Sequence, residues 1–395
     1  ELYVKYENDD SIPKTQVDAQ ELILDLLKER AETGRMYLMN IDHCNSHSSF
    51  TDKVEMSNLC QEITLPTKPI QHIDDDNGEI ALCILSAINI GKIRDFSDFE
   101  VLCDLAVRSL DELIDFQQYP VRAAELATKA RRSLGVGYIG LAHYLAKQGV
   151  SYGDPEAWKL VHDLTESFQY YLIKSTVNLA KEKGACQYSN HTKYSHGVLP
   201  IDTYKTDVDE LVPNKLNFDW ESLRQDVKKY GVRNSTLSAQ MPSESSSVVS
   251  NATNGIEPPR GYLSIKKSKK GPLKQIVPSY NTLKNNYTLL WDMPDNTGYI
   301  NIVAVMQKFF DQAISGNWSY NPQNYENSEV PVSVMAQDFL STYKYGWKTS
   351  YYQNTYDIKT DEVGDTLDNE KSDKLNCLLE ELSSLKEGEC ESCSI

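Results

Sequence analysis

An amide, a thiol and a carboxylate occupy alternate positions in the segment Asn58-Leu59-Cys60-Gln61-Glu62. In an extended segment, the side chains of Asn58, Cys60 and Glu62 share one face. A hydrogen-bonding amide, a reactive sulfur and a proton acceptor are the groups that a site needs to activate a polyol substrate. A lone cysteine in an apolar setting is more commonly an inert core residue, so the pentapeptide requires support from the rest of the chain.

Two further segments could take part in chemistry. The stretch from Met241 to Gly261 is rich in hydroxyl groups and small residues, which can bind a phosphate at a helix N-terminus, although an ordinary helix cap and turn is the simpler interpretation. The chain ends with a Cys-x-x-Cys pair, Cys390 and Cys393. Two thiolates leave a zinc shell incomplete, whereas a thiol pair on a flexible terminus suits the transfer of reducing equivalents.

Two other motifs carry weaker signals. The segment 135–140 has the Gly-x-Gly-x-x-Gly pattern of dinucleotide-binding proteins, but residues 123–134 predict a helix where that motif needs a strand, so close helix packing is expected. His43, Cys44 and His47 match no common zinc spacing. We therefore expect structural roles for these three residues and no metal site.

The composition limits the classes of function. The chain has 395 residues, with 40 basic and 57 acidic side chains and a formal charge of -17, which disfavours nucleic acid polymers and anionic membranes as partners. No apolar run reaches membrane length, and eight cysteines are too few for a secreted disulfide scaffold, so a soluble cytoplasmic protein is expected. The first residue is Glu1 rather than Met, which favours a fragment or a processed chain.

The hydrophobic pattern predicts an α/β protein in which strands are followed by helices. Apolar strands are expected at 36–41 and 80–90, and the polar stretch 42–57 leads into a loop that carries Cys60 at its tip. From Tyr356 onward the composition becomes acidic, which indicates a flexible tail over 356–395. Helices are expected at 15–35, 97–118, 121–147, 155–184, 299–315 and 330–344.

Together these segments resemble the C-terminal portion of the large, catalytic subunit of class I ribonucleotide reductase, of the aerobic bacterial or phage type. The resemblance extends along the whole chain. It implies that residues 1–355 form the C-terminal part of a ten-stranded α/β barrel, with a central finger loop at about 50–66. The motifs that carry it are Asn58-Leu59-Cys60-Gln61-Glu62, Ala81-Leu82-Cys83, Met241-Pro242-Ser243-Glu244, the run 250–262, Tyr351-Tyr352-Gln353-Asn354-Thr355 and the terminal cysteine pair.

The resemblance also implies roles for individual residues. A thiyl radical on Cys60 would abstract the 3′ hydrogen of a ribonucleoside diphosphate, Glu62 would act as general base, and Asn58 would hold the ribose hydroxyls. Cys83 would be one of two thiols that are oxidised to a disulfide, and its partner cysteine is absent from this chain. Cys390 and Cys393 would reduce that disulfide and be reduced in turn by thioredoxin or glutaredoxin.

The radical would arrive through Tyr351 and Tyr352 from a separate small subunit that carries the metal and radical cofactor, so no cofactor is expected on this chain. Adjacent residues on a regular strand point in opposite directions, so stacking of these tyrosines would require a local departure from strand geometry. Glu244, Ser245 and Ser246 match the substrate diphosphate loop, with Ser245 in place of the usual threonine.

The resembled subunit is longer at its N-terminal side, so we expect this chain to be inactive without an N-terminal half, in the cytoplasm of a bacterial cell, including one infected by a phage. Two alternatives remain open. An inactive interaction module would be expected to have lost some of the matched residues, and a thiol–disulfide oxidoreductase centred on Cys390 and Cys393 leaves the pentapeptide and the tyrosine pair unexplained. Structural roles are expected for Cys44, Cys103 and Cys186, and Cys377 falls in the tail.

Overall fold

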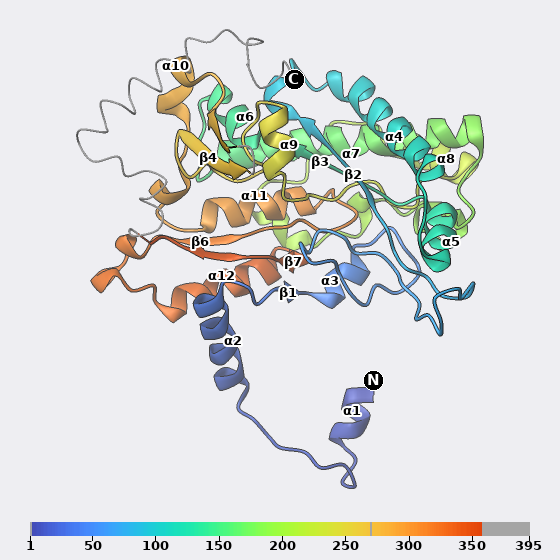
Figure 1. The fold of residues 1–395 in the computed structure, drawn as a ribbon, viewed down its shortest axis with the longest axis horizontal. Helices are drawn as coiled ribbons and strands as arrows, with labels where there is room; N and C mark the ends of the chain where they lie inside the picture. The colour runs from blue at the N-terminus through green and yellow to red at the C-terminus, as the bar shows by residue number, and fades with distance from the viewer. Residues whose placement is uncertain (1, 269–270, 358–395) are drawn as a thin grey trace.

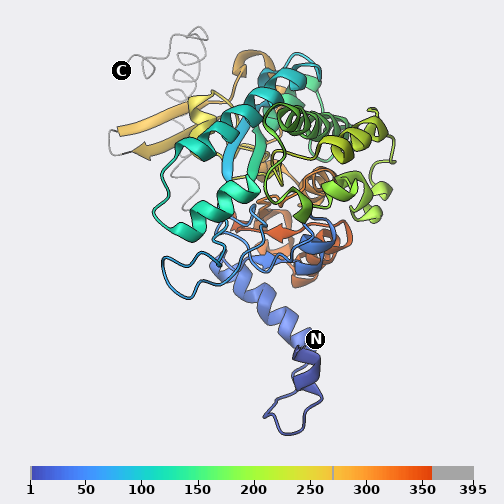
Figure 2. The ribbon, with the colours of Figure 1, turned by 90° about the vertical axis from the view of Figure 1, so that its right-hand side faces the viewer.

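A computed structural model describes residues 2–268 and 271–357, and it combines long helices with short strands (Figure 1). Residues 358–395 lie outside the described part of the chain, and with them Cys377, Cys390 and Cys393 and nearly all of the predicted tail. Helix α1 (Leu2–Glu7) lies away from the body at the end of an N-terminal arm (Figures 1 and 2). Helix α2 (Ala19–Thr33) connects this arm to the body through contacts with the C-terminal elements.

A row of parallel extended segments forms the centre of the fold. Strand β2 (Ile84–Asn89) pairs in parallel with β3 (Leu134–Ile139), from Ile84 opposite Leu134 to Asn89 opposite Ile139. Parallel bridges then join Val136 to Ser238 and Gln240 to Ile314. Strand β6 (Trp318–Tyr320) pairs in parallel with β8 (Gln353–Thr355). This is the arrangement of a partial α/β barrel, as predicted, and the sheet does not close within the described residues.

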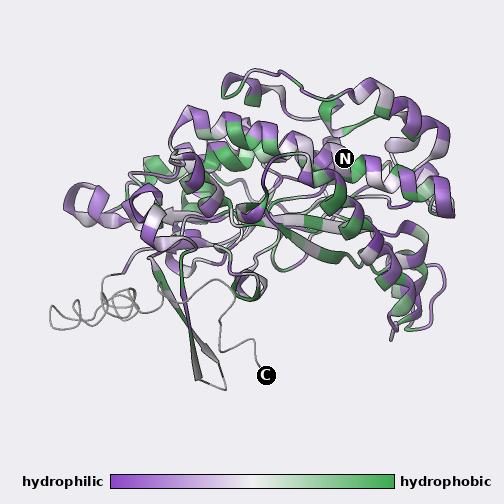
Figure 3. Ribbon diagram, turned by 90° about the horizontal axis from the view of Figure 1, so that it is seen from above, coloured by the Kyte–Doolittle hydropathy of each residue, from purple (hydrophilic) through white to green (hydrophobic). Residues whose placement is uncertain are grey.

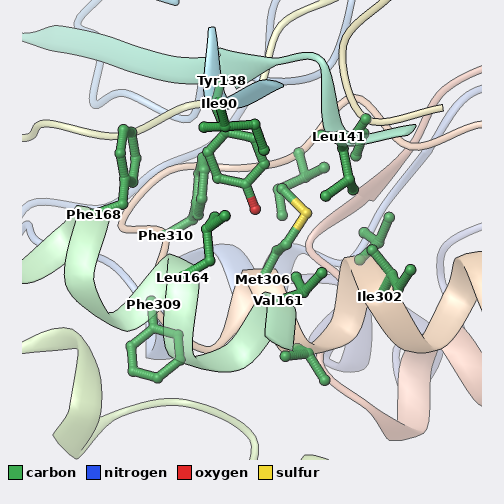
Figure 4. Close-up of a cluster of buried hydrophobic side chains, with 14 of the residues drawn as sticks. Ile90, Tyr138, Leu141, Val161, Leu164, Phe168, Ile302, Met306, Phe309 and Phe310 are labelled. Carbon is green, nitrogen blue, oxygen red and sulfur yellow. The ribbon is translucent and has the colours of Figure 1, made fainter. Parts of the chain in front are cut away.

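Long helices cover these segments. Helix α4 (Asp98–Phe116) packs against β2 and β3 and also against α7 (Pro155–Lys183), which contacts α11 (Thr297–Gln307). Tyr138 of β3 meets Phe168 and Phe310 edge to face, with ring centroids 5.4 and 5.9 Å apart (Figure 4). Such aromatic pairs contribute about 1 kcal/mol each beyond the area they bury. The core therefore holds the strand row against α7 and α11.

The helix predicted over 121–147 is wrong, because this stretch forms three elements. Helix α5 (Arg122–Arg131), strand β3 and helix α6 (Leu141–Gln148) follow one another. Glycine allows close neighbours on β3: a Cβ on Gly137 would lie 2.7 Å from the carbonyl oxygen of Ala239, and one on Gly135 would lie 2.8 Å from the Cys83 sulfur. The Gly-x-Gly pattern thus serves close packing of a strand, where packing of a helix had been expected.

The other elements that the sequence predicted agree in type and differ in length. The predicted helix 299–315 ends at Gln307, and the predicted strand 36–41 is reduced to β1 (Leu38–Met39), which pairs antiparallel with β7 (Thr349–Ser350). An antiparallel hairpin is formed by β4 (Leu263–Ser268) and β5 (Gly271–Ile276). The remaining helices are α3 (Ile41–Ser46), α8 (Trp220–Tyr230), α9 (Glu244–Val249), α10 (Tyr280–Leu283) and α12 (Val332–Lys344).

Hydrophobic and hydrophilic residues alternate along the helices (Figure 3). This is the pattern of helices that bury one side against a core and expose the other to water. Within the described ranges, no helix combines the length and the apolar character that crossing a membrane requires.

Candidate active site

The segment that carries Cys60 is a loop without regular secondary structure over 51–66. A loop was predicted here, and it is not extended from Asn58 to Glu62, because Gln61 adopts a left-handed conformation with φ 68° and its N–H donates to the carbonyl of Asn58 at 3.1 Å. The turn nevertheless keeps the functional groups together. The Asn58 Oδ1 accepts from the N–H of Ile63 at 3.1 Å, and the Asn58 side chain also contacts the Glu62 carboxyl group.

Three other segments hold the backbone of this loop. The Ser315 hydroxyl donates to the carbonyl of Cys60 at 2.5 Å, and the Thr349 hydroxyl donates to the carbonyl of Gln61 at 2.9 Å. The N–H of Ala313 donates to the carbonyl of Glu62 at 3.1 Å. Three successive carbonyls are thus bonded, so the tip of an irregular loop is fixed in position.

Glu62 is buried, with 3 % of its surface exposed, and one of its carboxylate oxygens, Oε2, has no hydrogen-bond partner. Burial raises the pKa of this carboxyl group, and the contact with Asn58 opposes the shift. An unpartnered buried carboxylate oxygen carries a large desolvation cost, which a substrate hydroxyl would relieve. The arrangement suits a general base.

Cys83 is half-buried, directly precedes β2 and packs against a small core cluster of Cys44, Phe50, Val54 and Leu65. The Gln312 side chain donates from Nε2 to the Cys83 sulfur at 3.4 Å. Burial raises the pKa of the Cys83 thiol to about 12, and the negative charge of Glu62 acts in the same direction. Cys83 therefore belongs to the same site as Glu62.

Tyr351 and Tyr352 lie between β7 and β8, where the chain departs from strand geometry. Their ring centroids are 4.0 Å apart with an angle of 49° between the planes, and the Tyr351 hydroxyl lies 3.5 Å from the Cys60 sulfur. Burial and the neighbouring Cys60 raise the pKa of Tyr351, whereas the Tyr351 hydroxyl lowers the pKa of Tyr352. The two rings and the sulfur thus form a continuous series of contacts.

Two residues that the sequence did not single out complete this cluster. The Tyr37 ring lies 4.7 Å from Tyr351 and 5.4 Å from Tyr352 between centroids. Arg30 is fully buried and donates to the carbonyls of Tyr351 at 2.9 Å and Tyr352 at 3.3 Å. The sequence around Arg30 and Tyr37 gives no sign of these roles. Both residues contact Tyr351, which lies more than three hundred positions later in the chain.

Glu244, Ser245 and Ser246 form the exposed first turn of α9, which follows the segment 236–240. The segment 312–315 lies beside 236–240, and the finger loop runs along it. Thr64 bonds to Gln312, Glu62 to Ala313 and Cys60 to Ser315. Its tip therefore points toward the carboxyl end of the parallel row, and α9 begins at this end. This is the end at which open α/β sheets and α/β barrels bind ligands.

The histidines and Cys44 near the loop bind protein groups. His43 bonds through Nδ1 to the carbonyl of Trp347 at 2.9 Å, and His47 bonds to the carbonyl of Gln307 and the Thr203 hydroxyl. The buried Cys44 sulfur contacts the carbonyl of Lys348 at 3.6 Å. These contacts give the three side chains structural roles.

One cluster on α7 has a metal-ligand composition, His162, Asp163 and Glu166, whose ligand atoms lie within 4.8 Å of one another. Protein donors already use its carboxylates. Glu166 accepts from the N–H groups of residues 217 and 218 and from the Trp220 indole at 3.0 Å, and Asp163 pairs with Lys159 at 2.7 Å. We interpret the cluster as the anchor of the segment before α8.

The fold and the site define a ribonucleotide reductase barrel domain. The family model described as "Ribonucleotide reductase, barrel domain" matches residues 1–353, and the chain belongs to this family. It is 58% identical over 371 residues to the ribonucleoside-diphosphate reductase subunit alpha of Haemophilus influenzae, covering 93% of this chain and 49% of that protein.

Two other relatives give the same picture. The subunit alpha of ribonucleoside-diphosphate reductase 1 from Escherichia coli is 53% identical over 367 residues, covering 92% of this chain and 48% of the relative. The subunit alpha of ribonucleoside-diphosphate reductase from Enterobacteria phage T4 is 42% identical over 380 residues, covering 92% of this chain and 50% of the relative. The chain thus spans about half the length of these curated relatives.

Proposed function

We propose that this chain is the C-terminal catalytic part of a class I ribonucleoside-diphosphate reductase, which reduces ribonucleoside diphosphates to deoxyribonucleoside diphosphates by a radical mechanism. The observation that carries the proposal is a series of two contacts. The ring centroids of Tyr352 and Tyr351 are 4.0 Å apart, and the Tyr351 hydroxyl lies 3.5 Å from the Cys60 sulfur. A pathway of this kind suits the transfer of an oxidising equivalent, and a structural cluster would not need to end on a half-buried thiol.

In the proposed reaction, a separate small subunit with a metal and radical cofactor supplies one oxidising equivalent to Tyr352. The equivalent passes to Tyr351, whose phenoxyl oxygen takes the hydrogen atom of the Cys60 thiol. The Cys60 radical then takes the 3′ hydrogen atom of the ribose, and Glu62 accepts the proton of the 3′ hydroxyl through its unpartnered oxygen. Asn58, which already contacts Glu62, orients the hydroxyls.

Loss of the 2′ hydroxyl as water consumes two electrons, which Cys83 and a second thiol supply as they form a disulfide. Within this chain no matching second cysteine is expected, and we assign it to an N-terminal half. Cys390 and Cys393 return the electrons and are reduced in turn by thioredoxin or glutaredoxin. The diphosphate of the substrate binds at Glu244, Ser245 and Ser246, at the end of the barrel toward which the Cys60 tip points.

An unfinished edge of the sheet supports the need for an N-terminal half. Among the described residues, β2 pairs with β3 alone, and its other edge carries no strand. Leu82, two residues before this strand, and Leu85 on it remain 37% and 42% exposed. Unpaired edges with apolar side chains are unfavourable in water, and a further strand from the other half would cover this one. We place the assembled enzyme in the bacterial cytoplasm, where thiols remain reduced.

The test is reconstitution of the chain with the N-terminal half of a relative's alpha subunit, its small subunit, a ribonucleoside diphosphate and thioredoxin. We expect deoxynucleotide formation that Cys60→Ser abolishes. Cys186→Ala is the matched control, because Cys186 is a buried cysteine outside the proposed site and its removal should leave turnover in place. Turnover by the Cys60→Ser complex would refute the radical role, and turnover without the N-terminal half would refute the need for it.

The same variant separates the remaining alternatives. An inactive interaction module would bind the small subunit and give no deoxynucleotide in any of these mixtures. A thiol–disulfide oxidoreductase centred on Cys390 and Cys393 would exchange thiols equally well with and without Cys60. Reductase activity that depends on Cys60 excludes both.

A further inference from the structure

Gln312 is fully buried between the finger loop and the strand row, next to the Cys83 sulfur. Its backbone is fixed on both sides, because its N–H donates to the carbonyl of Ser238 at 3.0 Å and its own carbonyl accepts from Lys348 and Gln307 at 2.9 Å each. The side chain therefore starts from a rigid point. A residue of this kind can set the position of a neighbouring group.

The orientation of the Gln312 amide follows from its two backbone partners. The Oε1 accepts from the N–H of Thr64 at 3.2 Å, and Nε2 donates to the carbonyl of Leu134 at 2.9 Å. A backbone N–H can only donate and a carbonyl can only accept, so a flipped amide would lose both bonds. The second N–H of Nε2 is therefore the group that faces the Cys83 sulfur, at 3.4 Å.

Strand β3 also lies close to the sulfur. A Cβ on Gly135 would come within 2.8 Å of the Cys83 sulfur, so the glycine leaves the space that the sulfur fills. Gly135 follows Leu134, whose carbonyl orients the Gln312 amide. The sulfur thus lies close to both a glycine and an N–H donor, and the bond from Gln312 to Leu134 joins these two neighbours.

We propose that Gln312 is a positioning residue for the redox chemistry of Cys83. Its side chain holds the Cys83 sulfur in place and favours the thiolate over the thiol. An N–H donor is a stronger partner for an ionised sulfur than for a neutral one. The pKa of Cys83 is raised to about 12 because burial outweighs the Gln312 hydrogen bond, which acts in the lowering direction. The inference deepens the proposed function, on which its role in the reductase rests.

In that function, the bond from Gln312 assists the step in which the active-site disulfide is reduced. A tail thiolate attacks the sulfur that is paired with Cys83 and forms a new S–S bond to it. The bond between that sulfur and Cys83 breaks, and Cys83 leaves as a thiolate with the electron pair. A leaving thiolate that is better stabilised leaves faster.

The test compares Gln312→Met with Gln240→Met. Gln240 is also buried, and its side-chain amide accepts from the backbone N–H of Tyr138. The same amide donates to the carbonyls of Tyr138 and Met241, so it makes the same number of bonds as Gln312 but none to a sulfur. The 395-residue chain is treated with iodoacetamide between pH 7 and 9, and the modification of Cys83 is followed by peptide mass spectrometry. Circular dichroism checks that each variant is folded.

We expect the Gln312→Met chain to be modified at Cys83 about threefold more slowly at each pH. A rise of one unit in the pKa leaves tenfold less thiolate, and each thiolate is then roughly threefold more nucleophilic. Gln312→Glu, which turns a carboxylate oxygen toward the sulfur, should slow the reaction further. Gln240→Met should react at the wild-type rate.

Equal or faster modification in Gln312→Met would overturn the inference, since a merely structural role would loosen the site and expose Cys83. Gln312→Glu is an independent second variant, and a rate at or above wild type in that chain would also overturn it. The assay needs no N-terminal half, small subunit or nucleotide. If modification is slowed in Gln312→Met but the reconstituted reductase is inactive, the result therefore counts against the proposed function and not against the role of Gln312.

Discussion

The buried ammonium group of Lys348 gives a quantitative prediction for the pH dependence of stability. Its side chain is fully buried and donates to the carbonyls of Phe310 at 3.2 Å and of Asp311 and Gln312 at 2.9 Å each. Burial lowers the pKa of Lys348 to about 7 from its ordinary value of 10.5. Lys348→Met removes the titrating group and keeps an unbranched side chain of similar length.

The sign follows from the direction of the shift. Between pH 7 and 10.5 the unfolded chain keeps the proton that the folded chain has released, so the free energy of unfolding rises with pH in this window. Linkage integrated from pH 7 to pH 9 gives a gain of about 2 kcal/mol for the wild type. The Lys348→Met chain should lack this gain, so the difference between the two chains should change by about 2 kcal/mol over the two pH units.

The assay is urea unfolding of both chains at pH 7, 8 and 9, with the midpoint and slope fitted at each pH. Lys344→Met is the matched control, because Lys344 is an exposed lysine that pairs with Glu210 at 2.5 Å and its pKa is raised, so it does not titrate in this range. Parallel stability curves for the wild type and Lys348→Met would refute the reasoning, since Lys348 would then carry no depressed pKa.

Three further predictions concern the site. Glu62→Gln should raise the free energy of unfolding in urea by about 1 kcal/mol at neutral pH, because burial raises the pKa of this carboxyl group and penalises its ionised form. The same substitution should abolish deoxynucleotide formation. Arg30→Met should lower the free energy of unfolding by about 3 kcal/mol through lost bonds to buried carbonyls, whereas Lys28→Met, exposed on the same helix, should stay within about 0.5 kcal/mol. Tyr351→Phe should keep the ring stack and the urea midpoint but lower turnover of the reconstituted enzyme by more than about a hundredfold, and retained turnover would remove the hydroxyl from the pathway.

The sequence predicted best where a strong local pattern coincides with regular structure. Helices α4 and α7 follow the expected ranges 97–118 and 155–184 closely, because their apolar residues recur at helical spacing over several turns. The prediction of one helix over 121–147 was wrong because every residue of β3 is buried, so its sequence lacks the alternation of an ordinary strand and resembles the apolar side of a helix. A short apolar run cannot be assigned to a strand or a helix by periodicity alone.

In the site, the motifs identified the chemical groups but not their geometry. The contact of Gln312 with Cys83 and the contact of Tyr351 with Cys60 join residues that are 229 and 291 positions apart in the sequence. The departure from strand geometry that stacking of Tyr351 and Tyr352 required is present. Local propensity carries no information about such contacts, so Tyr37, Arg30 and Gln312 gave no signal in the sequence.

The construction of the site explains why these distant contacts are needed. The finger loop, the segment 308–317 and the tyrosine pair are irregular, so helix and strand ladders cannot satisfy their backbone groups. Buried side chains satisfy these groups instead, because Lys348 binds the carbonyls before Ala313, Arg30 binds those of the tyrosines, and Ser315 binds that of Cys60. Such bonds fix a backbone without imposing a repeating geometry. A thiol, a carboxylate and two phenol rings can therefore converge at distances that a regular strand, with its alternating side chains, would not permit.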